Sequence, residues 1–393
     1  MAGLYIHVPF CERKCSYCDF YSEELVSSKK QISNIKLKIN SNSLSVFSDF
    51  LSREMKLFVA LHKDLPEINT IFIGGGTPSL LVPAKLSEII EIIRSNFKIV
   101  PNAEITLESN PGKISFQKLK SYREAGVNRI SIGAQSFVES ELMFLERIHN
   151  PKQIETAFAD ARNAGFDNIN IDLMFSVPSQ TKETLAYSLF QAIKLKPEHI
   201  SSYSLIYEPG TPLFDDWQSG KVKKLSDDED AELFDFTINF LRNAGYIQYE
   251  VSNYALNEKY KCKHNLNYWN GGEYLAFGPS AHAYFNNHRF WNYRSLSCYY
   301  ELLNSDKLPV EGSEYISTTD KLNEIIMLGL RAEGLNLDDL KNMFSFDLFS
   351  RANEYIEQMI DTGFLNYDGK ILSSTAAGYK VCDEIILKII SLI

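Results

Sequence analysis

The 393-residue sequence has no apolar run near the roughly 20 residues that a helix needs to cross a bilayer. It also lacks a charged stretch followed by an apolar one near its beginning, the pattern of a secretory signal peptide. The sequence also has fewer basic than acidic residues: 40 Lys and Arg against 50 Asp and Glu give a net charge of −10. We therefore expect no transmembrane segment, no leader and no general nucleic-acid-binding surface.

Cysteine is scarce, with six residues in the whole chain. Three of the six are scattered, at Cys262, Cys298 and Cys382, and three lie together near the beginning, at Cys11, Cys15 and Cys18. So few cysteines argue against a disulfide framework and for a reducing compartment. We expect a cytoplasmic protein whose 45% hydrophobic content supports an ordinary globular core.

The clustered cysteines have the spacing C-x3-C-x2-C and follow a short β-branched run, Leu4 to Val8, that is typical of a strand. Three thiolates on one turn can converge on one metal centre. A [4Fe–4S] cluster normally takes four Cys ligands, so three leave one iron open for substrate. The alternatives are a zinc loop, for which His7 is the nearest fourth ligand, and three unrelated thiols. The position after a strand favours the cluster.

The stretch from YIHVPFC to CDF resembles the radical SAM (S-adenosylmethionine) superfamily. Within it, the stretch is most similar to the branch of oxygen-independent coproporphyrinogen III oxidases and HemW-type haem chaperones. The resemblance extends from Tyr5 to the C-terminal region. It implies a [4Fe–4S] cluster whose open iron chelates the methionine moiety of SAM. Reduction by one electron would then cleave an S–C bond to give methionine and a 5′-deoxyadenosyl radical.

Short apolar runs alternate with helical patterns through the first part of the chain. The strand centres lie near residues 6, 72, 106, 131, 171 and 202, and the helices between them are expected from Val46, over 83–97, 114–125, 137–164 in two pieces, and 181–194. Six βα units are too few for an eight-stranded barrel, so we expect an α/β fold with an incomplete, open (βα)6 barrel. Functional groups in such a barrel sit at the strand ends. Those positions hold Cys11, Gly74 to Thr77, Glu108, Gln135, Asp172 and Ser204.

The chain is expected to have three parts: the partial barrel over 1–225, an extension over 226–314, and a helical, winged-helix-like region over 315–393. The polar segment 22–45 predicts a surface loop or a frayed helix. A helix over 227–246 should begin at Ser226 or Asp227 and stop at Gly245. The last helix, ending IILKIISLI, is amphipathic, which leaves peripheral membrane contact open but favours packing on its own domain.

The resemblance also implies which residues contact SAM. The matching positions are Tyr5, Tyr17, Gly75, Gly76, Thr77, Glu108, Gln135, Arg147 and Asp172. The chemistry fits, because a glycine-rich turn exposes backbone groups, a strand-end carboxylate can hold ribose hydroxyls, and Arg suits a planar carboxylate. Alone, each residue also has an ordinary explanation as a cap, a surface charge or core packing. Two departures stand out: Glu146 where relatives usually carry Gly, and Phe175-Ser176 in place of a YG-type turn.

Two features separate the branches of this family. The cysteine pattern typical of the oxidases is C-x3-C-x2-C-x-C, with an extra Cys two positions after the third. This chain has Phe20 at that position, which resembles the pattern of HemW-type chaperones. The segment HNLNYW matches the HNxxYW motif that this branch associates with haem, which implies that His264, Asn265, Tyr268 and Trp269 contact haem. An imidazole can ligate haem iron and aromatic rings can pack on the macrocycle. Cys262 and His282 are alternative ligands.

The sequence therefore favours a HemW-type haem chaperone with a cluster and a SAM site, which would pass haem to recipient, respiratory haemoproteins and need a one-electron reductant. A coproporphyrinogen III oxidase is the alternative, and a radical SAM enzyme with another substrate is a more distant one. The sequence leaves open whether the chain turns over a substrate, because the SAM machinery is present while Phe20 replaces the extra cysteine.

Overall fold

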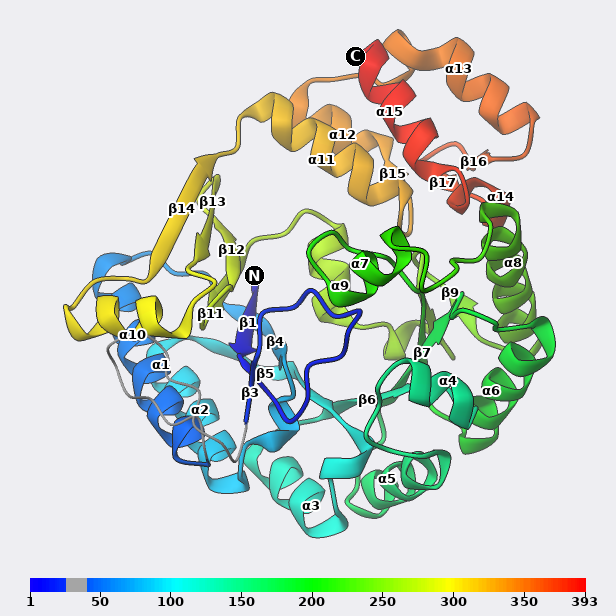
Figure 1. Cartoon of the computed structure of the whole chain (residues 1–393). Helices are drawn as coiled ribbons and strands as arrows, with labels where there is room; N and C mark the ends of the chain where they lie inside the picture. The colour runs from blue at the N-terminus through cyan, green and yellow to red at the C-terminus, as the bar shows by residue number, and fades with distance from the viewer. Residues whose placement is uncertain (26–40) are drawn as a thin grey trace.

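A computed structural model describes residues 1–25 and 41–393 of the chain (Figure 1). The predicted alternation of strands and helices is confirmed. The central strands are β1 (Ala2–Val8), β4 (Ile68–Gly75), β5 (Ile99–Ser109), β6 (Arg129–Gln135), β7 (Ile169–Phe175) and β8 (His199–Ser204). Each pairs in parallel with the next in this order. The predicted incomplete barrel is therefore present.

Helices cover the outer side of the curved row of strands (Figure 1). They are α1 (Ser41–Leu61), α2 (Pro83–Asn96), α3 (Phe116–Ala125), α4 (Glu139–Phe144), α5 (Pro151–Asn163) and α6 (Lys182–Leu195). Strand residues such as Leu4, Ile6 and Ile71 are fully buried, as expected for a parallel sheet covered by helices. Helix starts follow capping chemistry: Asn150 and Gln153 form a capping box at the start of α5.

The sheet continues beyond the barrel on both edges, which the sequence did not predict. Within the described residues its order is β14-β13-β12-β11-β1-β4-β5-β6-β7-β8-β10-β9. The added strands are β9 (Ile247–Gln248), β10 (Asn253–Ala255), β11 (Tyr274–Phe277), β12 (His282–Phe285), β13 (His288–Asn292) and β14 (Val310–Tyr315). Because β11 pairs in parallel with β1, the strand that precedes the cysteines also borders the extension. The division predicted at 225 and 226 stays a prediction, and one sheet runs through both parts.

The barrel and the extension contain several other elements. They are α7 (Pro212–Gln218), α8 (Asp227–Asn243), α9 (Lys263–Trp269), α10 (Leu296–Asn304) and the short 3-10 turns Pro78–Leu80, Pro111–Lys113 and Glu258–Tyr260. The sequence predicted Ser226 or Asp227 as the start of α8, and Ser226 is its N-cap. Ser226 forms a capping box with Glu229.

The predicted loop or frayed helix over 22–45 falls largely outside the described residues. Of its described part, Glu23–Glu24 forms a short strand, β3, that pairs with β2 (Phe10–Cys11). Helix α1 begins at Ser41, earlier than the predicted Val46. The short β2–β3 pair closes the cysteine segment into a loop at the end of β1.

The C-terminal region has its own hydrophobic cluster, between Ile326 and Ile389. Its elements are α11 (Thr318–Leu330), β15 (Leu335–Asn336), α12 (Leu337–Phe344), α13 (Phe349–Asp361), β16 (Leu365–Tyr367), β17 (Ile371–Ser374), α14 (Ala376–Tyr379) and α15 (Cys382–Leu392). This order matches the predicted helices and hairpin. Ile385 and Ile386 of α15 are buried in that cluster, so the last helix packs on its own region.

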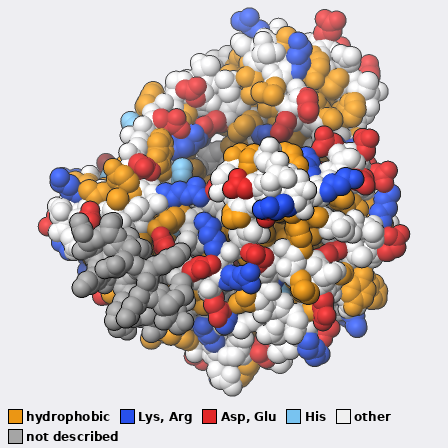
Figure 2. Space-filling model, viewed as in Figure 1, with side chains coloured by type: hydrophobic (Ala, Val, Ile, Leu, Met, Phe, Trp, Pro, Cys, Tyr) orange, Lys and Arg blue, Asp and Glu red, His pale blue; other side chains and the backbone are white. Residues whose placement is uncertain are grey.

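No helix in the described residues is long and apolar enough to cross a membrane. In the space-filling view of the side shown in Figure 1, the surface is hollowed between the C-terminal region and the rest of the molecule, with Lys, Arg and His side chains beside the hollow (Figure 2).

Candidate functional site

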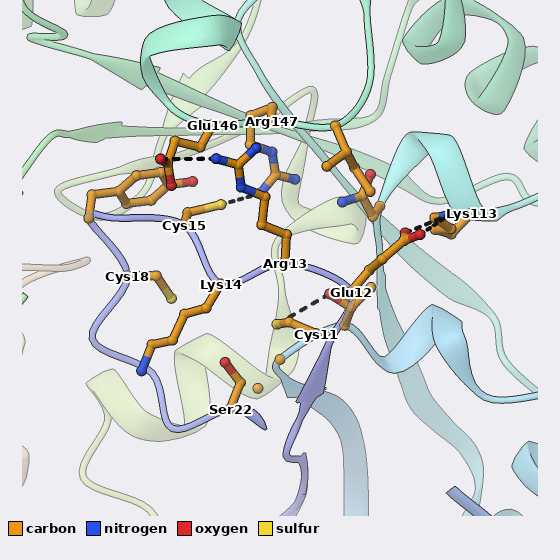
Figure 3. Close-up of a pocket in the computed structure, with 16 residues that line it drawn as sticks. Cys11, Glu12, Arg13, Lys14, Cys15, Cys18, Ser22, Lys113, Glu146 and Arg147 are labelled. Carbon is orange, nitrogen blue, oxygen red and sulfur yellow. Dashed lines mark hydrogen bonds and ion pairs between the residues drawn. The ribbon is translucent and has the colours of Figure 1, made fainter. Parts of the chain in front are cut away.

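The cysteine loop, residues 11–20, lies at the carboxyl end of β1, where the barrel geometry predicts functional groups. A tight turn joins two of its cysteines, since the Cys18 amide donates to the Cys15 carbonyl at 3.1 Å. Figure 3 shows the sulfur atoms of Cys11, Cys15 and Cys18 around one space. All three cysteines are free thiols. Burial raises the pKa of Cys18 to about 11, and binding to a metal centre would release its proton.

The three cysteines line a small pocket, here called the cysteine pocket, that opens to solvent. The other lining residues are Glu12, Arg13, Lys14, Tyr17, Ser22, Gly75, Gly76, Thr77, Asn110, Lys113, Glu146, Arg147 and Ile148. The structure therefore brings the cysteines together with the predicted glycine-rich turn and with Arg147.

The donor set of the cysteine pocket suits a multi-iron cluster better than a single metal ion. Within residues 1–25 and 41–393, no group of three or more His, Cys, Asp or Glu side chains is arranged to hold one ion. The cysteines of an iron–sulfur cluster bind different iron atoms, so their sulfur atoms need not all lie within bonding distance of one point. The zinc alternative also loses its fourth ligand, because the two ring nitrogens of His7 lie 2.8 Å from the Tyr21 carbonyl and 3.2 Å from the Tyr5 hydroxyl.

The glycine-rich turn after β4 fits against the cysteine loop so closely that side chains are excluded. Gly75 has a φ of 107°, which L-residues rarely adopt, and a Cβ at Gly76 would lie 2.5 Å from the Phe10 carbonyl oxygen. The Gly76 and Thr77 amides donate to the carbonyls of Val8 and Phe10, at 2.8 and 2.7 Å. Thr77 Oγ1 also lies 3.5 Å from the Cys11 sulfur. The turn is thus fixed to the loop through backbone bonds.

Two carboxyls that were predicted at strand ends, Glu108 and Asp172, are half-buried on the barrel strands β5 and β7, with Asp172 in the middle of its strand. Glu108 accepts a hydrogen bond from the Gly75 amide at 3.2 Å, and burial and then the nearby Asp172 raise its pKa to about 8. Asp172 accepts bonds from Ser131 Oγ at 2.8 Å and Asn170 Nδ2 at 2.7 Å, and burial raises its pKa. A cation bound beside Glu108 would favour its ionised form.

Arg147 joins the barrel to the cysteine loop. Its guanidinium donates to the Gly133 carbonyl at 3.0 Å and lies 3.9 Å from the Cys15 sulfur, a contact drawn in Figure 3. Its buried Nε has no partner among the described residues, so one donor remains for a ligand. Tyr17 lines the same pocket, and burial raises its pKa. Gln135, at the end of β6, has a left-handed backbone with φ of 67°.

Both departures from the family pattern occur at left-handed positions, where glycine is the ordinary choice. Glu146 has a φ of 53° and Ser176 a φ of 60°. The Glu146 carboxylate accepts from the Ser16 amide and from Arg13 Nη2, each at 3.1 Å, and therefore holds the cysteine loop (Figure 3). Ser176 instead donates to Asp230. Ser204, another predicted strand-end group, also donates to Asp230, at 2.7 Å, and lines neither of the pockets described in this section.

A second cavity, here called the aromatic cavity, lies on the other side of the cysteine loop. It has a volume of about 370 Å³, is partly open to solvent, and is lined by Tyr5, His7, Asp19, Phe20, Tyr21, Tyr268, Tyr274, Ser280, His282 and Arg294. Residues 5–21 and 268–294 meet there because β1 and β11 are parallel neighbours. Tyr5 stacks on Phe72, with ring centroids 6.3 Å apart. Of the SAM positions implied by the sequence, Tyr5 lines this cavity rather than the cysteine pocket.

His264, the first residue of the HNxxYW motif, is buried and fully hydrogen-bonded. Its Nδ1 lies 2.8 Å from Thr70 Oγ1 and its Nε2 lies 2.9 Å from the Tyr268 hydroxyl. Its ring stacks on Phe72, with centroids 5.1 Å apart. Burial, and then Arg129, lowers its pKa to about 3. Binding iron at either nitrogen would break one of these bonds, so in this structure the side chain positions Tyr268.

The other residues named for haem differ in location. Tyr268 lines the aromatic cavity, whereas Asn265 and the half-buried Trp269 do not. Cys262 is fully buried, with its thiol 3.6 Å from Glu104 Oε1, and it too lies outside the cavity lining. His282 lines the cavity and is exposed. The structure thus keeps Tyr268 and His282 at one surface and separates them from the rest.

Sequence reasoning missed two groups: Arg294, which lines the aromatic cavity, and Glu54, which lies outside its lining. Arg294 pairs with Asp19 at 2.7 Å and ties the end of β13 to the cysteine loop. Glu54 of α1, fully buried, accepts from the Gly278 amide at 2.9 Å and from the Tyr299 hydroxyl at 2.6 Å. Burial raises the pKa of Glu54 to about 7. Glu54 could have been noticed from the sequence, because it is a carboxylate within the apolar helical pattern from Val46 to Phe58. No sequence feature indicated a role for Arg294.

Comparison with known proteins adds family relationships to this geometry. Residues 5–191 match the model of the radical SAM superfamily, and residues 316–381 match the model of the HemN C-terminal domain. The chain is 34% identical over 391 residues to the protein named heme chaperone HemW of Bacillus subtilis, covering 96% of this chain and 98% of the relative. It is 40% identical over 283 residues to the heme chaperone HemW of Escherichia coli, covering 72% and 69%.

Among solved structures, the chain is similar to coproporphyrinogen III oxidase (HemN) from Escherichia coli, described as a radical SAM enzyme. The TM-score is 0.81 at 22% identity, and the match covers 100% of this chain and 90% of that one. At this identity the likeness establishes the fold. It also agrees with the barrel and the helical C-terminal region described above.

Proposed function

The chain belongs to the heme chaperone HemW family of the radical SAM superfamily, and from this membership we propose that it binds haem and delivers it to recipient haemoproteins. The alternative, oxidative decarboxylation of coproporphyrinogen III, is not favoured by the curated relatives, which carry the chaperone name.

The observation that carries the proposal is the pair of cavities on opposite sides of the cysteine loop. One is lined by three thiols and the charged residues Lys14, Arg147 and Glu146, and the other mainly by aromatic rings. A polar pocket with thiolates suits a cluster and a charged amino acid, whereas an aromatic cavity suits an apolar macrocycle.

In the cysteine pocket, Cys11, Cys15 and Cys18 would hold a [4Fe–4S] cluster, and the turn at Gly75 to Thr77 together with Arg147 would hold SAM. When bound, the reduced cluster supplies one electron to SAM. The chain's own part is to bind and orient. The free Nε of Arg147 offers a donor to a carboxylate, and Glu108, with its pKa near neutrality, can take either protonation state beside a ligand.

The chain departs from an oxidase at Phe20. The pattern typical of coproporphyrinogen oxidases has a fourth cysteine at this position. In this chain the Phe20 side chain is 67% exposed and lines the aromatic cavity. A phenyl ring neither binds iron nor moves a proton, but it offers apolar surface. This favours holding a porphyrin over converting one.

The partners in this proposal are haem, a one-electron reductant and recipient haemoproteins of the respiratory chain. The cytoplasmic location stays a prediction. Because the surface is acidic overall, with a net charge of −10, a recipient with a basic face would be steered toward it.

One reconstituted sample tests the function. The full chain is reconstituted anaerobically with iron and sulfide, and SAM and reductant are added. Haem binding is followed by titration, transfer by passage of haem to a haem-free respiratory acceptor, and oxidase activity by formation of protoporphyrinogen IX from coproporphyrinogen III. We expect haem binding and transfer without porphyrin turnover. Turnover at an enzyme-like rate would overturn the chaperone assignment.

A further inference from the structure

We propose that the aromatic cavity is the haem seat, with His282 as the ligand to the iron and Arg294 as the partner of a haem propionate. The proposal rests on the proposed haem-binding function and names the site at which it occurs. It places the iron ligand and the partner of the propionate outside the HNxxYW motif, on the strand β12 and on the segment after β13.

The hydrogen bonds of the seven histidines in the chain favour His282 as the ligand. Four of them have both ring nitrogens bonded: His7, His149, His199 and His264. Two more, His62 and His288, bond a backbone carbonyl through Nδ1 and lie outside the cavity lining. No described residue hydrogen-bonds either nitrogen of His282. A neutral imidazole with a free nitrogen is what haem iron takes as an axial ligand.

The position of His282 also suits a ligand. Its side chain is exposed and lines the aromatic cavity. Its ring stacks on Trp291 of the neighbouring strand, with centroids 5.9 Å apart and planes 21° from parallel. Burial lowers its pKa from the ordinary value of 6.5, so the neutral form dominates at neutral pH. Stacking fixes the ring plane without using either nitrogen, which preorganises the imidazole for coordination.

Arg294 gives the cavity its positive charge. Its Nη2 lies 2.7 Å from Asp19 Oδ1, and the two side chains are about half exposed. A guanidinium has five N–H donors in a planar fork, so a second carboxylate can join or displace Asp19. A haem propionate is such a carboxylate. Because Asp19 directly follows Cys18, a propionate bound here would contact the cysteine loop itself.

Aromatic surface completes the site. Phe20 is exposed at the cavity, and Tyr268 packs edge-on against Tyr274 with ring centroids 4.6 Å apart. Aromatic rings in such arrangements suit packing against a porphyrin plane or edge. The cavity volume of about 370 Å³ falls within the roughly 300–1,000 Å³ of ligand sites. The histidine, the arginine and the apolar rings therefore match the three chemical parts of haem: iron, propionate and macrocycle.

The test compares the full chain with His282→Ala, Arg294→Gln and the control His288→Ala. His288 is exposed and on the adjacent strand but outside the cavity lining. Each protein is titrated with haem, and the Soret band and the electron paramagnetic resonance signal of ferric haem report the axial ligand. We expect His282→Ala to weaken haem binding about ten- to a hundredfold and to change the ligand signature. Added imidazole should restore that signature. Arg294→Gln should weaken binding with an unchanged signature.

The outcomes separate the two proposals. Wild-type haem affinity and an unchanged ligand signature in His282→Ala would overturn this site while leaving haem binding by the chain intact. Equal losses in His282→Ala and His288→Ala would also overturn it, because the control should bind as the wild type does. Absence of haem binding by the wild-type chain would instead overturn the proposed function, and this site with it.

Discussion

The two cavities beside the cysteine loop are assembled in different ways. The cysteine pocket is built from short motifs that each follow a barrel strand, such as the cysteine loop after β1 and the glycine turn after β4. The aromatic cavity is built from β1 and from strands β11 to β13, about 270 residues away in sequence. The cysteine pocket can therefore be predicted from sequence motifs. The aromatic cavity forms only when β1 and β11 pair in parallel in the folded sheet.

One loop serves both cavities, with its two halves facing opposite ways. Residues 11–15, 17 and 18 line the cysteine pocket, and Asp19, Phe20 and Tyr21 line the aromatic cavity. The loop is held from one side by Glu146, through the Ser16 amide, and from the other by Arg294, through Asp19. Each anchor can be removed without the other. Substitutions on one side should therefore test whether the cavities act separately.

The largest expected effect is that of Cys15→Ser on the cysteine pocket alone. A [4Fe–4S] cluster with three protein ligands would lose one of them, so we expect near-complete loss of bound iron and of cluster absorbance after reconstitution. Haem affinity at the aromatic cavity should stay close to that of the wild type. Cys298→Ser, at a half-buried cysteine on α10 outside the pocket, is the matched control and should keep the cluster. A full cluster in Cys15→Ser would remove the cluster assignment.

The second effect is the loss of stability in His264→Ala, a substitution next to Tyr268, which lines the aromatic cavity. The variant loses two buried hydrogen bonds, to Thr70 and Tyr268, and the stacking on Phe72. We expect the free energy of unfolding to fall by about 2–4 kcal/mol, with cluster content unchanged. Denaturant unfolding measures this, and the half-buried His62, with a single hydrogen bond, supplies the control His62→Ala.

A different result would change the role of the motif. If His264→Ala kept wild-type stability and lost haem entirely, His264 would be the iron ligand rather than the residue that positions Tyr268. Equal haem binding by the folded variant and the wild type would take His264 out of the haem argument.

The third effect is on the pH dependence of stability without ligands, and it tests Glu108, which accepts a hydrogen bond from the Gly75 amide of the cysteine pocket. The pKa of Glu108 rises from 4.5 to about 8 in the folded chain. Its unfolded form ionises first, so this group's contribution to stability is lost as pH rises from about 4.5 to 8 and then levels off, at most about 1.4 kcal/mol per pH unit. Glu108→Gln should flatten the curve in that range.

Glu91→Gln, at an exposed carboxylate of α2, is the control and should leave the curve unchanged. Buried Glu54 and Glu250 also have pKa values raised to about 7, so some slope remains in every variant. The difference between Glu108→Gln and the wild type isolates the Glu108 contribution. An unchanged slope would mean that Glu108 is ionised in the folded chain.

The outcome of prediction from sequence follows the same division between the cavities. The strand-end rule placed Cys11 after β1 and Glu108 near the end of β5 correctly, because parallel strands carry a strong apolar signal, but it was wrong for Asp172, which lies in the middle of β7. Strands β11 to β14 are only four to six residues long and mix polar with apolar residues, so they gave no clear period. Nothing local indicates that Thr70 lies opposite His264. The aromatic cavity and Arg294 could therefore not be predicted.

The smallest expected effect separates local anchoring of the loop from global stability. Glu146→Gly relieves a left-handed backbone, by about 1 kcal/mol, and loses the half-exposed pair with Arg13, worth about 0–1 kcal/mol. The global free energy of unfolding should change by less than about 1 kcal/mol. The Ser16 amide loses its acceptor, so hydrogen exchange there should become faster.

Ser176→Gly is the matched control, because it relieves a similar backbone, with φ of 60°, but contacts Asp230 rather than the loop. Faster exchange at Ser16 in Glu146→Gly alone would show that this carboxylate holds the loop on the side of the cysteine pocket. Faster exchange at the amides of Asp19 to Tyr21 as well would show that the two halves of the loop move together. The cavities would then be coupled through the loop, and a ligand in one would alter affinity in the other. Unchanged exchange at Ser16 would leave Arg294 and the β2–β3 pair as the anchors of the loop.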